Sequence, residues 1–175
     1  MPARIEDYAV LGDTQTAALV SREGSVDWLC VPRFDSPACF AALLGAPKHG
    51  RFLLAPRAEP RRVERRYREG TLVLETDYKT ADGVVTVVDA MPPRDRVPDL
   101  VRIVQGQRGR VPMRMELTVR FGYGQFSPWI KRLSGDLVAV SGPDALRLST
   151  PVETRDEGAS RAVRSNSVTG GGGSG

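Results

Sequence analysis

Residues 24–40, GSVDWLCVPRFDSPACF, hold the side chains of this chain that are best suited to chemistry. Asp27 and Asp35 place two carboxylates in one short stretch, and acid–base hydrolysis needs such a pair. Aspartates beside turns, however, usually accept backbone N–H bonds or pair with an arginine. We therefore assign no catalytic role to Asp27 or Asp35.

Other reactive side chains are too few or wrongly spaced for a site. His49 is the only histidine, it precedes Gly50 in an expected loop, and no nucleophile elbow surrounds it. Cys30 and Cys39 lack the CxxC spacing of redox and zinc motifs. No phosphate-binding loop precedes a helix. The sequence thus predicts no catalytic residue, no metal and no cofactor, and two reduced, partly buried thiols.

The composition is that of one globular domain. The chain has 175 residues, of which 41% are hydrophobic and 26% charged, and its net charge of +4 comes from 25 basic against 21 acidic residues. We find no secretory signal and no apolar run of about 20 residues. In the basic segment 61–70, RRVERRYREG, glutamates alternate with arginines, which indicates a solvated face with cross-strand ion pairs. We expect a cytoplasmic protein that binds neither nucleic acid nor a membrane.

The elements that must position residues 24–40 are short strands. Apolar residues recur with period two along most of the chain, and the turn residues between them are typical of hairpins. In residues 111–121, VPMRMELTVRF, apolar and polar side chains alternate cleanly, and a Gly/Arg loop separates this strand from the one at 100–106. The pattern predicts an all-β fold, an antiparallel β-sandwich.

A single helix is expected within the sandwich, near residues 37–44. Ser36 is a good N-cap, Pro37 fits the first helical position, and Gly45 suits a left-handed C-terminal residue. The apolar run ACFAALL between them predicts a short buried helix.

Two interpretations of the stretch remain open. We expect Trp28, Cys30 and Phe40 to belong to the core. Arg33, Asp35 and Ser36 either brace the turn around Phe34 or contact a ligand at the rim of a pocket.

The order of motifs resembles the N-terminal signature of glycoside hydrolase family 15, in its bacterial trehalase-like and glucoamylase-like branch. The similarity begins with YAVLGDTQTAALVSREGSVDWLCVPRFDSPACFAALLG, continues through GRFLLAP, VVDAMP, LVRIVQG and FGYG, and covers residues 5–150. The resemblance implies a super-β-sandwich followed by an (α/α)6 barrel that carries two catalytic glutamates and hydrolyses an α-glucoside with inversion. No barrel is encoded in these residues.

The resemblance therefore implies a non-catalytic domain whose partner is the barrel and whose relation to the α-glucoside is indirect. Trp28, Arg33, Phe34, Asp35 and Ser36 are its candidates for the pocket rim or the domain interface. The alternative is a free-standing β-sandwich module that binds a carbohydrate or a protein.

Domain boundaries follow from the same pattern. We expect a β-sandwich over residues 1–150 that lacks its last strands, a polar extension over 151–164, and a flexible Gly/Ser linker over 165–175. Missing strands would leave an open sheet edge, so we expect the chain to self-associate.

Overall fold

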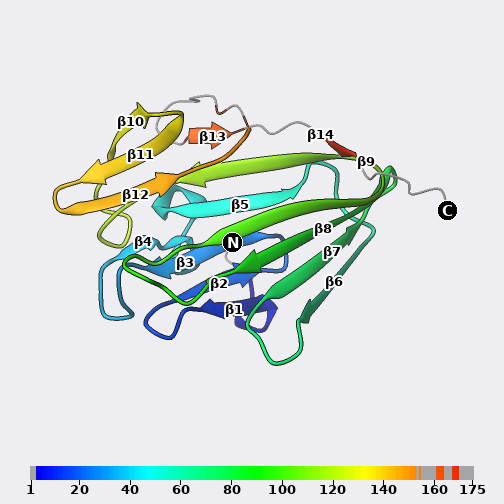
Figure 1. Ribbon diagram of the computed structural model, residues 1–175, viewed down its shortest axis with the longest axis horizontal. Helices are drawn as coiled ribbons and strands as arrows, with labels where there is room; N and C mark the ends of the chain where they lie inside the picture. Colours follow the sequence, from blue (N-terminus) through cyan, green and yellow to red (C-terminus); the bar gives the residue numbers. More distant parts are fainter. Residues whose placement is uncertain (1–2, 153, 155–160, 164–166, 170–175) are drawn as a thin grey trace.

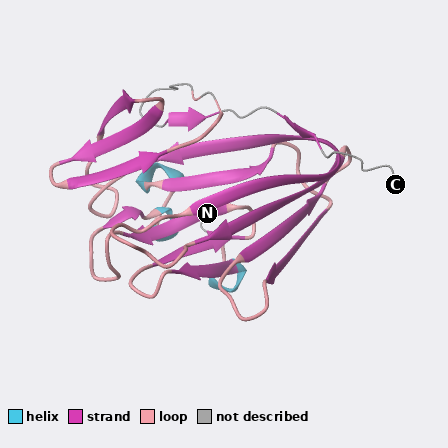
Figure 2. Cartoon of the chain, viewed as in Figure 1, coloured by secondary structure: helices cyan, strands magenta, loops and turns pink. Residues whose placement is uncertain are grey.

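The computed structural model describes residues 3–152, 154, 161–163 and 167–169. Antiparallel strands form most of it, and the helical segments of the described residues are short 3-10 turns (Figure 2). The turns are η1 (Ile5–Asp7), η2 (Ala42–Leu44) and η3 (Pro47–His49). The strands are β1 (Tyr8–Gly12), β2 (Ala17–Ser21), β3 (Ser25–Cys30), β4 (Ala38–Phe40), β5 (Arg51–Pro56), β6 (Arg62–Tyr67), β7 (Leu74–Lys79), β8 (Gly83–Ala90), β9 (Val101–Thr118), β10 (Trp129–Leu133), β11 (Asp136–Ser141), β12 (Asp144–Leu148), β13 (Arg161–Val163) and β14 (Ser167–Thr169).

One curled sheet forms both layers of the sandwich (Figure 1). Its strand order is β1-β2-β3-β5-β9-β8-β7-β6, and β10-β11-β12 form a separate three-stranded sheet. The second half of β9 pairs with β5, whereas its first half pairs with β8, so β9 belongs to both layers. The prediction of an antiparallel β-sandwich is confirmed.

The strand β9 runs without interruption across the Gly/Arg loop that the sequence predicts, so that prediction is wrong. A β-bulge replaces the loop: Val84 lies opposite Arg108 and Val85 opposite Gly106, which leaves Gln107 as the extra residue. Because side chains alternate along a strand, one extra residue exchanges the inward and outward faces. Even-numbered residues before the bulge are the less exposed ones, and odd-numbered residues after it are buried.

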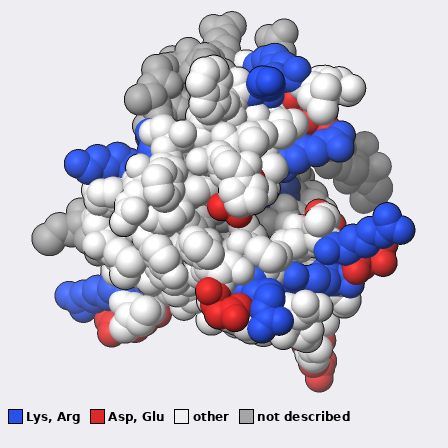
Figure 3. All heavy atoms as spheres, turned by 90° about the vertical axis from the view of Figure 1, so that its left-hand side faces the viewer, with Lys and Arg blue, Asp and Glu red and all other residues white. Residues whose placement is uncertain are grey.

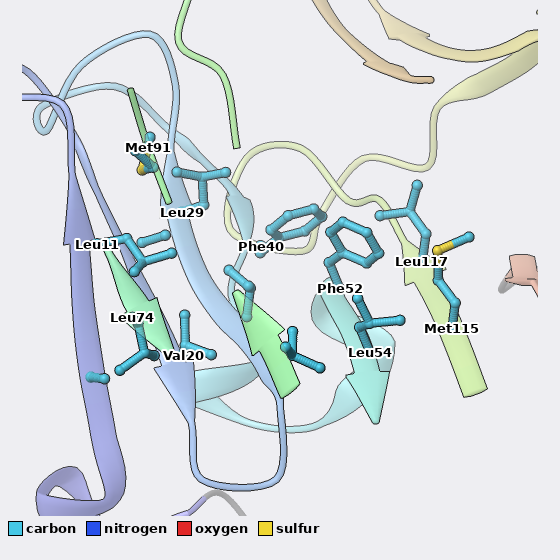
Figure 4. Close-up of a cluster of buried hydrophobic side chains, with 14 of the residues drawn as sticks. Leu11, Val20, Leu29, Phe40, Phe52, Leu54, Leu74, Met91, Met115 and Leu117 are labelled. Carbon is cyan, nitrogen blue, oxygen red and sulfur yellow. The ribbon is translucent and has the colours of Figure 1, made fainter. Parts of the chain in front are cut away.

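The core lies between the layers and draws large apolar side chains from both (Figure 4). Leu11 and Val20 come from the first layer, and Leu74 comes from the second. The alternation predicted for residues 111–121 is confirmed, since these apolar side chains are all buried: Val111, Met113, Met115, Leu117, Val119 and Phe121.

A buried arginine joins the two layers. The guanidinium of Arg102 donates to both carboxylate oxygens of Asp89, at 2.8 and 3.2 Å. It also donates to the backbone oxygens of Phe52, at 2.7 Å, and Gly24, at 2.9 Å. Both charged side chains are only 2% exposed, and the guanidinium lies 5.0 Å from the Phe52 ring centroid. The ion pair of the β8–β9 layer thus holds the backbone of the opposite layer.

The prediction of a helix at 37–44 is wrong. Ala38–Phe40 form β4, which pairs with the end of β3, and Ala42–Leu44 form the 3-10 turn η2. Pairing with β3 satisfies backbone groups of this apolar run, so burial does not require a helix. Ser36 closes a turn with Arg33 instead of capping a helix, and Gly45 has an extended φ of −169°.

The outer strands of the curled sheet are joined by side chains. The Tyr67 hydroxyl on β6 accepts a hydrogen bond from the Val10 N–H, at 2.8 Å, and donates to the Val10 oxygen, at 3.0 Å. Arg66 on β6 bridges to Glu75 and Asp77 on β7. The interpretation of residues 61–70 as a face with cross-strand ion pairs is therefore confirmed.

The C-terminal segment contains strands that the sequence does not predict. β13 pairs with Met115–Leu117 of β9, and β14 pairs with Arg110–Pro112. The expectation that residues after 150 form no strand is thus wrong, and these two strands lie along an edge of β9. The remainder of the predicted linker, residues 170–175, lies outside the described residues.

Candidate functional site

Four connections meet at one end of the sandwich, which we call the loop end: residues 13–16, 31–37, 91–100 and 119–128. The Phe34 N–H donates to the Gln15 oxygen, which joins 31–37 to 13–16, and the Tyr123 N–H donates to the oxygen of Ala38, which directly follows residue 37. This end faces left in Figure 1. The candidate residues of the sequence all lie at or beside it.

Trp28, Cys30 and Phe40, the expected core residues, have different surroundings. Phe40 is buried in the main core, as expected. Cys30 is buried in a smaller cluster with Ala38 and Ala41, and Trp28 packs against that cluster while remaining half-buried. A bulge at Asp27 in the β2–β3 pairing turns Trp28 away from the main core. Its ring centroid lies 6.1 Å from that of Tyr123, at the loop end.

The other candidates form an exposed turn between β3 and β4. The Arg33 Nε donates to the Asp35 Oδ1 at 2.9 Å, and both side chains are mostly exposed. This hydrogen bond from Arg33 lowers the pKa of the Asp35 carboxyl below its usual value. Phe34, between them, is 62% exposed. The turn therefore presents an aromatic ring beside a fixed charged pair, an arrangement suited to a polar partner or a sugar.

A buried ion pair between Asp13 and Arg94 lies next to this turn and stabilises it. Asp13 accepts hydrogen bonds from the N–H groups of Gln15, at 3.0 Å, and Thr16, at 2.8 Å, and from Arg94 Nε at 2.7 Å. The Asp13 and Arg94 side chains are only 0% and 7% exposed. Burial opposes ionisation of Asp13, yet the hydrogen bonds from Arg94 and the backbone lower its pKa below the usual value. The backbone oxygen of Gln15 also accepts the Phe34 N–H. The Asp13–Arg94 pair therefore fixes the exposed turn.

Sequence reasoning missed Asp13 and Arg94 because they are 81 positions apart. The local signal in GDTQT indicates only that Asp13 begins a turn by accepting nearby N–H bonds. Nothing in the sequence around Arg94 indicates its partner.

The surface of the loop end is largely uncharged. Figure 3 views this end and shows charged side chains mainly at its margin. Exposed apolar side chains occur in each of three loops, as Phe34, Val97 and Phe126, and at the start of β10, where Trp129 is 81% exposed. Exposed apolar groups that cluster on one face mark interaction surfaces.

The residues considered for catalysis have structural roles. Asp27 accepts hydrogen bonds from the Ser25 hydroxyl, at 2.5 Å, and the Tyr8 hydroxyl, at 2.7 Å. His49 Nδ1 accepts the Ala46 N–H at 3.0 Å within the η3 turn. Among the residues that the structure describes, no group of three or more His, Cys, Asp or Glu side chains could hold a metal ion.

A protein-family model described as "Trehalase-like, N-terminal" matches residues 1–165. This chain belongs to the trehalase-like N-terminal family. Three relatives of this trehalase-like domain are trehalases from Mycolicibacterium smegmatis, Sulfolobus acidocaldarius (Trehalase 2) and Thermoplasma volcanium. The identities are 46%, 35% and 27%, over 50%, 67% and 87% of this chain.

The trehalase-like domain spans only a minor part of these relatives: the matched regions cover 13%, 19% and 25% of their lengths. No solved structure gives a significant match. Across the described part of the domain, no helix is both long and apolar enough to cross a membrane. Cys30 and Cys39 are both free and buried.

Proposed function

We propose that this chain is the non-catalytic N-terminal β-sandwich of an inverting α-glucoside hydrolase of family 15, with trehalose as the substrate of the whole enzyme. The observation that carries the proposal is the extent of the match, which takes up a quarter or less of each of the three trehalases. Catalysis would then belong to an (α/α)6 barrel outside this chain, and this domain would support the barrel.

The loop end is the surface proposed to contact the barrel. Its apolar side chains are exposed in this chain, and covering them removes apolar area from water. The buried Asp13–Arg94 pair holds two of its loops in one arrangement, so little conformational entropy is lost on docking.

Arg33, Phe34, Asp35 and Ser36 are proposed to rim the substrate pocket, with Trp28 behind them. The pair of Arg33 and Asp35 is preformed at 2.9 Å, and its guanidinium and carboxylate could bind sugar hydroxyls while Phe34 packs on a ring face. We place the enzyme in the cytoplasm, a proposal supported by two cysteines that are free.

A chimeric enzyme tests the proposal. In the M. smegmatis trehalase, this chain would replace the region that it matches, and glucose release from trehalose would be measured. We expect an active chimera, whereas the isolated chain should release no glucose. Phe126→Asp, which puts a charge on the loop end, should reduce activity. The matched control is Ala81→Asp, exposed in the turn between β7 and β8 and away from the loop end, and it should leave activity unchanged.

Two results would contradict the proposal. Glucose release by the isolated chain would show that the domain is itself catalytic. Equal activity of the Phe126→Asp and Ala81→Asp chimeras would show that the loop end does not contact the barrel.

A further inference from the structure

A cavity of about 530 Å³ lies beside the β2–β3 turn and β5, apart from residues 13–16 and 31–37 of the loop end. It is bounded by the β2–β3 turn, by β5 and by the connection 57–61 between β5 and β6. Residues 13–16 precede β2 and residues 31–37 follow β3, so the β2–β3 turn lies at the other end of both strands from these connections. The cavity falls within the size range of small-molecule sites, about 300–1,000 Å³. None of the candidate residues from the sequence lines it.

Tyr78 supplies the cavity with a polar group. The residue is only 2% exposed, it lines the cavity, and its hydroxyl has no hydrogen-bond partner among the described residues. The hydroxyl lies beside Gly24, where an added Cβ would come within 2.6 Å of it. Gly24 has a φ of +83°, so the backbone at this point both favours glycine and leaves the hydroxyl uncovered. A hydroxyl that faces a cavity and bonds no group of the described protein is open to a ligand.

Four arginines line the cavity, and they differ in how far they are committed to other partners. Arg51 and Arg114 share Glu116, at 2.6 and 3.4 Å. Arg22 donates to the Val63 oxygen at 2.9 Å. Arg57 forms no ion pair with any residue of the described part and is exposed. Arg57 is thus the guanidinium most available to a ligand.

Three carboxylates balance these arginines. Asp7, Glu23 and Glu59 line the same cavity, and none of them forms an ion pair within the described residues. Free carboxylates would repel an anion, and the guanidiniums would repel a cation. An apolar ligand would leave these charged groups desolvated without partners. The remaining class is a neutral ligand with many hydroxyl groups, which donate to carboxylates and accept from guanidiniums.

The rest of the lining suits such a ligand as well. Leu53, Ala55, Pro60 and Val63 contribute apolar surface to the cavity. A pyranose ring has C–H faces that can pack on apolar surface, and its rim of hydroxyls can reach the charged side chains.

We propose that this cavity is a saccharide-binding site, separate from the loop end. Its ligand is a neutral sugar of one or more pyranose units, bound through the Tyr78 hydroxyl, the Arg57 guanidinium and the three carboxylates. The proposal goes beyond the proposed function and does not depend on it.

The test is a calorimetric titration of this chain with trehalose, maltose and maltoheptaose, with inorganic phosphate as the charged comparison. We expect saturable sugar binding with a Kd in the range of about 1 mM. Tyr78→Phe removes only the unpaired hydroxyl and should weaken binding about tenfold. Tyr123→Phe makes the same change at the loop end and should leave the Kd unchanged. Arg57→Ala should weaken binding, whereas Arg96→Ala, at an exposed position in the 91–100 connection, should not.

The titrations show which sugar binds best, and some results would overturn the proposal. Tighter binding of maltoheptaose than of maltose indicates an extended glucan, and equal binding indicates a ligand of two units. Absence of saturable binding to all three sugars, or binding of phosphate in preference to them, overturns the proposal. If Tyr123→Phe rather than Tyr78→Phe weakens sugar binding, the sugar binds at the loop end and the proposal is overturned. Thermal unfolding of each variant checks the fold, and Arg57→Ala, at an exposed position, serves if Tyr78→Phe unfolds. The chimera experiment tests the proposed function independently of these titrations.

Discussion

Replacing Arg102 by methionine should lower the free energy of unfolding by about 3–5 kcal/mol, because it leaves the Asp89 carboxylate buried without its partner. The change also removes the donors to the Phe52 and Gly24 oxygens, although the Gly24 oxygen keeps the Leu54 N–H at 3.0 Å. In the double variant Asp89→Leu/Arg102→Met no charge stays buried. Its cost should fall to about 1–3 kcal/mol, the value for backbone oxygens that lose a donor.

Urea unfolding followed by tryptophan fluorescence measures these costs, with the m-value checking that unfolding stays two-state. The matched control is Arg66→Met, which removes an exposed arginine from its pairs with Glu75 and Asp77 and should leave the urea midpoint nearly unchanged. A cost below about 1 kcal/mol for Arg102→Met would refute the reasoning. A double variant less stable than Arg102→Met would do so as well, because it would show that the isolated carboxylate is not the main penalty.

Three further predictions concern the loop end. The pKa of Asp13 is lowered from its ordinary value of 3.8, so its stabilising contribution is present above that value and is lost as the pH falls through the folded pKa. Urea unfolding at neutral and at acidic pH should therefore show a smaller acid loss of stability in Asp13→Asn than in the wild type. In a full-length enzyme that carries this domain, Asp35→Ala should lower kcat/KM about tenfold with an unchanged melting temperature, and the reverse pattern would favour the brace over the pocket rim. The isolated chain should self-associate in light scattering, and Phe126→Asp should reduce this association if the apolar loop end, rather than a sheet edge, is responsible.

Sequence patterns predict this fold correctly where the alternation of apolar and polar residues alone decides the structure. Residues 111–121 alternate strictly between apolar and polar side chains, and residues 111–118 of this run form the end of β9, with the apolar side chains buried. The pattern fails at 37–44, because a short apolar run is compatible with either a helix or a buried strand. There the pairing of Ala38–Phe40 with β3 decides, and no signal in the run itself shows that partner.

The bulges limit prediction in a second way. An extra residue at Asp27 or Gln107 exchanges the faces of a strand, so the period of two holds on each side of the bulge but not across it. The supports of the candidate site are equally hidden, since Asp13 and Arg94 meet only after the sheet has folded. The exposed turn with Arg33 and Asp35, whose contacts are local, could be predicted from the sequence.

The shared strand β9 determines when a core can form during synthesis. Both β5 and β8 pair with β9, which ends at Thr118, so about two thirds of the chain must leave the ribosome before both layers are complete. Until then the edges of β5 and β8 are both unpaired, and nascent chains with such edges are prone to aggregate. Once β9 is in place, the two layers cannot separate without breaking the pairing of β9 with β5 or with β8. Its amide protons should therefore exchange with solvent only when the whole domain unfolds.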